Sequence, residues 1–178
     1  IVYSQLAAGS VIDLGADDDV LNLEWNGLVA GLLDGGSGND RLNLSWITLD
    51  LTDTSQVANF ESFYLSGGTY GIDQALIDSG MIVGGGSAVL NTSETSLDLS
   101  GWQFGPNFFF GTTNSEGTSF TVTDLATGLN VRGGAGNDSL LAQGFSFTEI
   151  QLVQLLDSGI ETVIDQNGTH GMNTDLFV

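Results

Sequence analysis

Short runs in which apolar and polar residues alternate recur along the chain. The two clearest runs, Leu21–Trp25 and Leu42–Trp46, alternate leucine with a polar residue, and each follows a turn rich in glycine and aspartate. Alternation with period two places the apolar side chains on one face of an extended segment, which is typical of a half-buried strand. The pattern therefore predicts short β-strands joined by tight turns.

These strands belong to an internal repeat. When the first fifty residues are laid over themselves at an offset of 21, the turns and strands of the two copies coincide. The matched positions are Asp13 with Asp34, Gly15 with Gly36, Asp19 with Asp40, Leu21-Asn22-Leu23 with Leu42-Asn43-Leu44, and Trp25 with Trp46. A unit of about 20 residues cannot bury its own apolar face, so such units stack into a solenoid. The expected fold class is all-β, a parallel β-solenoid.

A longer periodicity divides the chain into two modules. Residues 35–40 recur as residues 133–138, and residues 60–63 recur loosely as residues 160–163. We expect a first β-solenoid module over residues 1–100 and a second over residues 101–178. The boundary is blurred by an aromatic segment, residues 101–111, which contains the only proline. That segment is interpreted as a loop or corner over the core, with an exposed patch for a partner as the alternative.

Two segments depart from the strand pattern and predict short helices. Residues 72–79 and 147–158 both end in two apolar residues followed by Asp-Ser-Gly, and Ser146 and Glu149 form a capping-box pattern before the second. One or two short capping helices are therefore expected beside the strands. Their expected role is to cover a sheet edge that would otherwise be open.

Composition adds an unusual electrostatic constraint. The chain has 22 acidic residues against two basic ones, a formal net charge of −20, no lysine and no cysteine. Such a charge repels nucleic acid and anionic membranes, so neither is an expected partner. The acidic residues cluster in glycine-rich turns, and a hard divalent cation is an abundant way to offset clustered carboxylates. Calcium is therefore the expected cofactor.

Two nine-residue segments carry the most specific motif. Residues 35–43, Gly-Gly-Ser-Gly-Asn-Asp-Arg-Leu-Asn, and residues 133–141, Gly-Gly-Ala-Gly-Asn-Asp-Ser-Leu-Leu, match the pattern G-G-x-G-x-D-x-U-x. In this motif the chain resembles the repeats-in-toxin (RTX), or haemolysin-type, calcium-binding family. The resemblance implies a right-handed parallel β-roll or β-helix in which calcium lies between stacked turns. It implies as ligands the carboxylates of Asp40 and Asp138 and the carbonyl oxygens of Gly36, Gly38, Gly134 and Gly136.

The repeat offset adds two candidate ligands to this set. It predicts that the turn formed by residues 15–19 stacks on the turn that ends at Asp40, which makes Asp17 and Asp19 candidates for one shared calcium site. The alternative is a tight turn whose aspartates are solvated. No stacking partner for Asp138 is evident in the sequence. The family usually runs many nonapeptides in tandem, whereas here single copies lie 98 residues apart, so few ions are expected.

The two ends of the chain bear on where the protein acts. Residues 1–4 have neither an initiator methionine nor a signal peptide, which suggests a processed or excised end. Residues 175–178, Asp-Leu-Phe-Val, resemble the end of type I secretion substrates that carry these repeats. We therefore expect a secreted or cell-surface bacterial protein whose calcium sites are empty inside the cell and filled outside it.

The sequence predicts a protein that is not an enzyme. It has no G-x-S-x-G or H-E-x-x-H motif, and its single histidine, His170, is interpreted as an exposed loop residue rather than a base. The expected function is that of a calcium-binding extracellular structural or adhesive protein, such as a surface-layer, adhesin or filament component. Self-association or contact with other cell-surface components is expected. The alternative is a non-catalytic accessory module of a larger secreted carbohydrate-active enzyme or hydrolase.

Overall fold

The chain folds almost entirely into short β-strands. The computed structural model describes residues 5–24, 28–104 and 107–171, so the expectations for residues 1–4, for Trp25 and for residues 175–178 lie outside the described residues. Two compact units are present, residues 1–90 and residues 91–178. The predicted modules, with their boundary at residue 100, stay a prediction.

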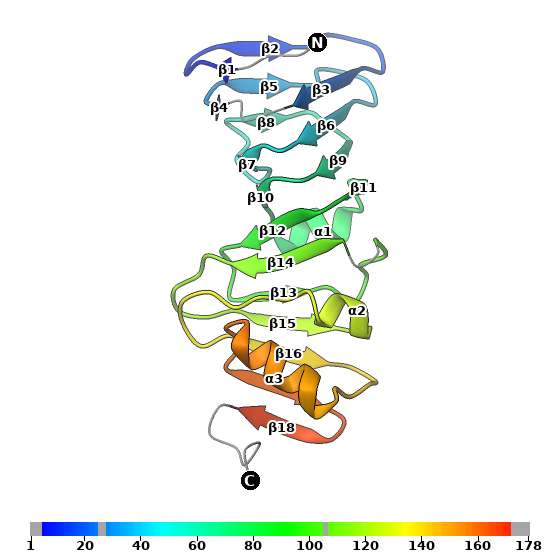
Figure 1. Cartoon of the computed structure of the whole chain (residues 1–178). Coiled ribbons are helices and arrows are strands. Elements are labelled where there is room, and N and C mark those ends of the chain that lie inside the picture. Colours follow the sequence, from blue (N-terminus) through cyan, green and yellow to red (C-terminus); the bar gives the residue numbers. More distant parts are fainter. Residues whose placement is uncertain (1–4, 25–27, 105–106, 172–178) are drawn as a thin grey trace. The chain divides into compact units, whose positions relative to one another are not determined.

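The first unit contains eleven described strands and one helix before the chain reaches a strand that spans the division (Figure 1). They are β1 (Gln5–Leu6), β2 (Val11–Asp13), β3 (Val20–Glu24), β4 (Leu28–Val29), β5 (Leu32–Asp34), β6 (Arg41–Ser45), β7 (Thr48–Asp50), β8 (Val57–Ala58), β9 (Ser62–Ser66), β10 (Thr69–Gly71), α1 (Gln74–Ser79) and β11 (Ile82–Gly86). Strand β12 (Ala88–Thr92) contains the point at which the units divide.

Every strand pair of the first unit is parallel, and the pairs form stacked columns. Strands β2, β5 and β8 make one sheet, strands β3, β6, β9 and β11 make a second, and β7 pairs with β10 in a third. In the second sheet Leu21 lies opposite Leu42, and Leu42 lies opposite Phe63, so the predicted offset of 21 is the observed register. All three side chains are buried. Alternation therefore places one column of apolar residues inside the unit and leaves the intervening residues outside.

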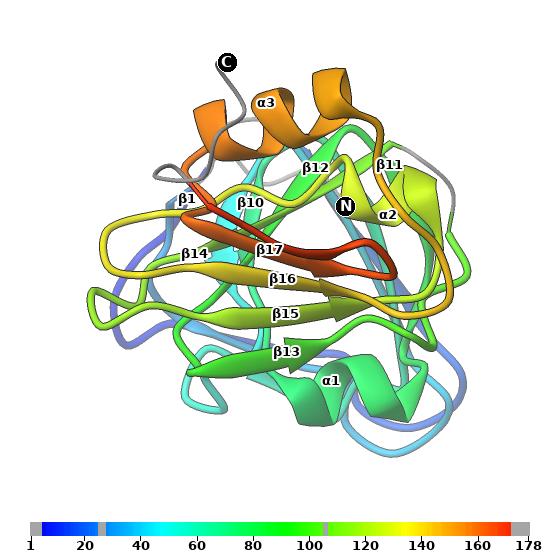
Figure 2. The same cartoon turned by 90° about the horizontal axis from the view of Figure 1, so that it is seen from below.

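The second unit is built around one five-stranded sheet (Figure 2). Its elements are β13 (Ser96–Asp98), β14 (Phe108–Thr112), β15 (Ser119–Val122), α2 (Leu125–Gly128), β16 (Ser139–Ala142), α3 (Glu149–Asp157), β17 (Thr162–Asp165) and β18 (Gly168–Gly171). The order is β13-β15-β16-β17-β18, and all neighbours are parallel except β18, which returns antiparallel to β17. A buried column, Leu97, Phe120, Leu140 and Val163, runs through the first four strands.

The helices were predicted in part. The described residues contain both expected helices, α1 and α3, and a third, α2, which is only four residues long. Helix α3 begins two residues later than the capping-box pattern indicated: its N-cap is Thr148, whose hydroxyl accepts from Gln151 N while its own N donates to Gln151 Oε1 at 2.9 Å. The predicted pair, Ser146 and Glu149, is therefore wrong as the capping box.

The aromatic segment is partly a strand. Phe108 and Phe110 lie in β14 with almost no exposure, and Trp102 packs edge-on against both rings at 5.1 and 5.0 Å between centroids. The Trp102 indole N–H donates to Phe104 O at 2.6 Å. The described part of this segment therefore contributes to the core, as the loop-over-core interpretation expected, while its second half forms a strand that the pattern did not predict.

The leucine column gives a first test of the packing. Leu42 is fully buried between Leu21 and Phe63, so Leu42→Ala should lower the free energy of unfolding by about 2–5 kcal/mol. The measurement is urea unfolding followed by circular dichroism. Val20→Ala, at a half-exposed position of β3, is the matched control and should change stability by no more than about 0.5 kcal/mol. Equal midpoints for the two variants would contradict the described register.

Candidate functional site: the stacked glycine and aspartate turns

The turn formed by residues 15–19 lies directly on the turn formed by residues 36–40, as the repeat offset predicted. Ala16 and Ser37 form a parallel β-bridge, Ser37 N donates to Gly15 O at 2.8 Å, and Asp17 N donates to Ser37 O at 3.1 Å. Gly36 has a φ of 91°, and a Cβ on it would collide with the Gly15 carbonyl. Glycine is therefore required here both by the backbone conformation and by the close approach of the two turns.

Asp40 connects this turn to the segments on both sides of it. It is fully buried, and its Oδ1 accepts a hydrogen bond from Asp19 N at 2.8 Å. Its own N donates to Glu61 Oε2 at 2.7 Å, and its carbonyl oxygen accepts from the N–H groups of Glu61 and Ser62. The sixth residue of the nonapeptide thus bonds to the repeat before it through the side chain and to the repeat after it through the backbone.

Asp138 makes the same connections in the second unit. It is 1 % exposed, its Oδ1 accepts from Thr118 N at 2.7 Å, and its N donates to Glu161 Oε2 at 2.7 Å. The stacking partner that the sequence did not reveal is the turn formed by residues 114–118. This turn does not match the nonapeptide pattern, because the side chain of Asn114 stabilises it. Asn114 Oδ1 accepts from Glu116 N at 3.0 Å, and Asn114 Nδ2 donates to Gly117 O at 2.8 Å.

Glu61 and Glu161 are the residues of the site that sequence reasoning missed. Both carboxylates accept the backbone N–H of the nonapeptide aspartate in the preceding turn, each at 2.7 Å. The signal was present in the loose recurrence of residues 60–63 as residues 160–163, since both tetrapeptides carry glutamate at the second position. The recurrence was used to infer two modules, but it did not reveal which group the glutamates bind.

The two aspartates differ in their second oxygen. Asp138 Oδ2 accepts from Gly134 N at 2.7 Å, whereas Asp40 Oδ2 is buried and has no hydrogen-bond partner among the described residues. The equivalent glycine N–H, that of Gly36, donates to Asp34 Oδ1 at 3.0 Å. In the second nonapeptide the position of Asp34 is taken by Arg132, which has no acceptor oxygen on its side chain. One substitution therefore explains why one carboxylate is fully satisfied and the other is not.

The carboxylates of Asp138 and Asp40, both predicted as calcium ligands, differ in how many of their oxygens accept hydrogen bonds. Asp138 accepts one backbone N–H group at each carboxylate oxygen, and each oxygen keeps a second lone pair. Asp40 keeps one buried oxygen without a partner. Within the described part of the chain, no three acidic or histidine side chains converge as a metal-binding group. Both oxygens of the Asp138 carboxylate thus accept a hydrogen bond from the protein, whereas one oxygen of the Asp40 carboxylate accepts none.

The remaining predicted ligands lie at the outer surface of these turns. The Asp17 residue is exposed and has a φ of 88°, and Asp19 is half-buried. Among the glycines whose carbonyl oxygens were predicted as ligands, Gly36 in the turn of Asp40 is half-buried. The others are exposed: Gly38 in the same turn, and Gly134 and Gly136 in the turn of Asp138. The structure thus brings Asp17, Asp19 and Asp40 into one pair of stacked turns. Whether these turns bind calcium stays a prediction.

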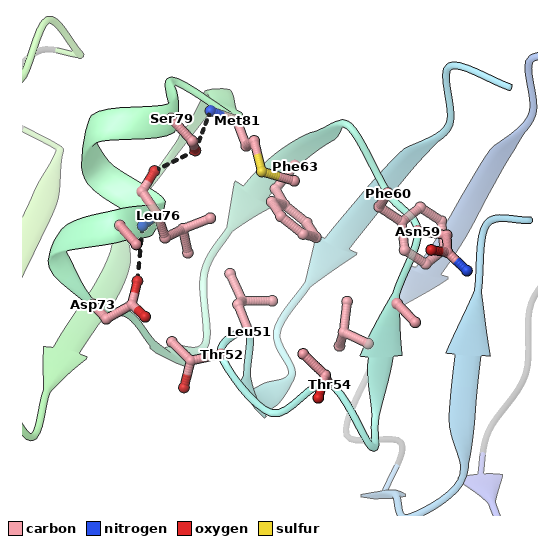
Figure 3. Close-up of a pocket in the computed structure, with 13 residues that line it drawn as sticks. Leu51, Thr52, Thr54, Asn59, Phe60, Phe63, Asp73, Leu76, Ser79 and Met81 are labelled. Carbon is pink, nitrogen blue, oxygen red and sulfur yellow. Dashed lines mark hydrogen bonds between the residues drawn. The ribbon is translucent and has the colours of Figure 1, made fainter. Parts of the chain in front are cut away.

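An apolar groove of about 450 Å³ lies between α1 and the edge of β8 (Figure 3). Its wall is formed largely by apolar side chains: Leu51, Val57, Phe60, Phe63, Leu76 and Met81. The polar groups beside α1 serve the helix itself, since Asp73 Oδ1 accepts from Leu76 N at 2.7 Å and Ser79 Oγ donates to Leu76 O at 2.8 Å. Among the residues that the structure describes, the sheet β2-β5-β8 has no fourth strand beside β8, and helix α1 lies there instead. The groove lies between this helix and β8.

His170 lies in strand β18 and not in an exposed loop as expected. Its Nε2 is 3.1 Å from Asp165 Oδ1 across the β17–β18 hairpin. Burial of the Asp165 carboxyl opposes its ionisation, but hydrogen bonds from Phe147 N, Asn167 N and His170 together outweigh burial and lower the pKa of Asp165. The pair closes the hairpin and anchors the segment that leads into α3.

Comparison with protein-family models, curated proteins and solved structures finds no match to this chain. The resemblance to the RTX family therefore rests on the two nonapeptides and stays a prediction. In the described part of the chain, no helix is long and apolar enough to cross a membrane.

The aspartate connections can be tested without reference to calcium. In Asp138→Asn one of the two backbone N–H groups, that of Thr118 or that of Gly134, would face an amide NH₂ instead of an oxygen, which should lower the free energy of unfolding by about 1–3 kcal/mol. Asp157→Asn removes one exposed carboxylate at the C-terminal end of α3 and should leave stability unchanged or slightly higher. The free energies of unfolding of both variants, measured in urea, test this prediction. Equal stability of the two would show that Asp138 does not hold the turns together.

The hairpin predicts a pH dependence. Because the pKa of Asp165 is lowered on folding, its contribution to stability is present above the unfolded-state value of about 3.9 and is lost as the pH falls through the folded-state value. Asp165→Asn should be less stable than the parent by about 1.5–3 kcal/mol near pH 7. This difference should shrink below about pH 4. Unfolding midpoints measured from pH 7 to pH 2.5 give the test, and a difference that does not vary with pH would refute it.

Proposed function

We propose that this chain is a right-handed parallel β-solenoid that serves as a calcium-stabilised structural or adhesive module outside the bacterial cell. The observation that carries the proposal is the stacking of equivalent turns and strands in constant register, with a buried aspartate joining successive repeats in each unit. Parallel strands joined by crossover connections are right-handed in about 98 % of known cases, which supports the right-handed form. Each stacked repeat is one rung of this solenoid.

A scaffold role agrees with the contacts that the polar and charged side chains of this chain make. The buried carboxylates of the turns accept backbone hydrogen bonds, and Asp165 and His170 bind each other within a hairpin. The polar groups of Asp73 and Ser79 beside the groove cap a helix. Each of these groups stabilises the fold. What stacked rungs supply is an extended surface, and such a surface suits adhesion or assembly better than it suits a reaction.

Calcium enters the proposal through the turn of Asp40. A buried carboxylate oxygen without a partner is costly, and an ion or water is the usual explanation for one. Asp40 and Asp19, with the exposed Asp17 and the carbonyl oxygens of Gly36 and Gly38, would hold the ion, since calcium prefers carboxylate and carbonyl oxygens. A bound divalent ion would offset part of the net charge of −20. The turn of Asp138 is satisfied by hydrogen bonds and is proposed to fold without an ion.

Extracellular action follows from the affinity expected of such a site. Calcium sites in extracellular modules commonly have dissociation constants of about 10⁻⁴–10⁻³ M, so they fill only at extracellular calcium concentrations. Folding of the first unit would then be completed after export. Type I secretion is the route proposed for that export.

The calcium proposal predicts a difference between the two aspartates. In 10 mM calcium the melting temperature of the parent protein should exceed that in excess chelator by about 5 °C. Asp40→Asn and Asp17→Asn should lose most of this increase. Asp138→Asn should melt lower than the parent in both buffers and keep the increase. The measurement is thermal unfolding followed by circular dichroism.

Two results would count against this assignment. A parent protein whose melting temperature is the same in calcium and in chelator would show that the turns are structural only. An increase that survives in Asp40→Asn and in Asp17→Asn, with Asp157→Asn as the charge-matched control, would place the calcium elsewhere. Because Asp17 is exposed, its variant keeps the test valid if Asp40→Asn fails to fold.

A further inference from the structure

Two exposed aromatic side chains of the first unit come from neighbouring positions in the sheet that contains β6 and β9. Trp46, directly after β6, is 60 % exposed, and Tyr64, in the neighbouring strand β9, is 45 % exposed. Asn43 pairs with Tyr64 and Ser45 pairs with Ser66, and Trp46 N donates to Ser66 O, so Trp46 lies one strand away from Tyr64 and three residues further along the sheet. Val83, which is 46 % exposed, lies at a bulge where β11 pairs with β9. We call Trp46, Tyr64 and Val83 the aromatic platform.

The two aromatic rings of the platform each pack against a glycine. A Cβ on Gly67 would come within 2.7–3.0 Å of three atoms of the Trp46 indole, which places the glycine under the face of the ring. A Cβ on Gly84 would lie 3.1 Å from the Tyr64 ring. Each ring therefore packs in part against glycine backbone and remains partly exposed to water. Trp46 also has a φ of 60°, a left-handed conformation that a bulky residue rarely adopts, and the sequence nevertheless places its largest side chain there.

The surroundings of the platform are polar but carry little charge. Asn43 Nδ2 donates to Asn22 Oδ1 at 2.7 Å in the strands beside Tyr64, and Asn43 Oδ1 has no partner among the described residues. The outward positions of β6, β9 and β11 include Arg41 and no carboxylate, and in the neighbouring strand β3 the exposed Glu24 lies opposite Ser45. On a chain with a net charge of −20, these strands thus present a face whose charged side chains are one arginine and one glutamate.

We propose that the aromatic platform binds an uncharged polysaccharide. A pyranose ring has an apolar C–H face, which fits an exposed indole or phenol ring, and a rim of hydroxyl groups, which fits amide and serine side chains. Polyanions are disfavoured by the charge of the whole chain, and near the platform the charges of Arg41 and Glu24 offset each other. The proposal rests on the adhesive role proposed above, for which it names the class of partner.

The test is native gel electrophoresis through gels containing one soluble polysaccharide at a time: dextran, glucomannan, laminarin or hydroxyethyl cellulose. At least one of these should retard the parent protein relative to a gel without polysaccharide. Trp46→Gly and Tyr64→Ser should each weaken that retardation at least tenfold in apparent affinity. Ile150→Ser is the control, because Ile150 is 73 % exposed on α3 and lies outside the platform. Trp46→Gly should not lose stability, since glycine favours the backbone conformation found there.

The outcomes separate this proposal from the calcium proposal. Retardation lost in both platform variants and kept in Ile150→Ser supports the platform, and melting of the same samples in calcium and in chelator reports on the ion independently. The proposal is overturned if none of the four polysaccharides retards the parent, or if the platform variants are retarded like the parent. It is also overturned if Trp46→Gly instead abolishes self-association measured by light scattering, because the platform would then be an interface between copies of the chain.

Discussion

The structure depends on how the N–H groups at the inner side of each tight turn are satisfied. When turns stack, the N–H groups of Asp19 and Thr118 face the neighbouring turn and not water, and a buried N–H without a partner costs about 1–3 kcal/mol. The carboxylates of Asp40 and Asp138 accept these bonds. A charged acceptor makes the stronger kind of hydrogen bond. The same constraint explains why both aspartates are buried although the chain has almost no cation to pair with them.

The register of the strands follows from these bonds. Because Asp40 is joined to Asp19 before it and to Glu61 after it, β6 can pair with β3 and β9 only at an offset of 21. A slip of one residue would turn Leu42 out to solvent, so the polar bonds at the turn and the apolar column in the strand enforce the same alignment. On the outer face the bond from Asn43 to Asn22 fits the same alignment, but the other outward side chains of these strands are not buried by it. The outer face is therefore free to carry side chains such as Trp46 that the fold itself does not require.

Much of the architecture was predictable because it arises from local pattern. Alternation predicted the strands, and the offset of 21 predicted the stacking of the turn of Asp19 on the turn of Asp40. The partner of Asp138 was not predictable, since Asn114 builds its turn with a different side chain. Helix α2 is too short to show a period. The buried role of the aspartates was missed because the nonapeptide resemblance directed attention to calcium, while the bonds to Glu61 and Glu161 join residues more than 20 positions apart.

Amide hydrogen exchange measured by NMR, in calcium and in chelator, tests the central claim most directly. The account predicts that the amides of Asp19, Asp40, Thr118 and Asp138 exchange as slowly as those of the buried strand residues Leu42 and Leu140. It predicts this although the turns themselves lie at the surface. Rapid exchange at these four amides in both buffers, like that of exposed loop residues such as Asn137, would contradict it. The carboxylates would then not join the turns, and another interaction would have to set the register.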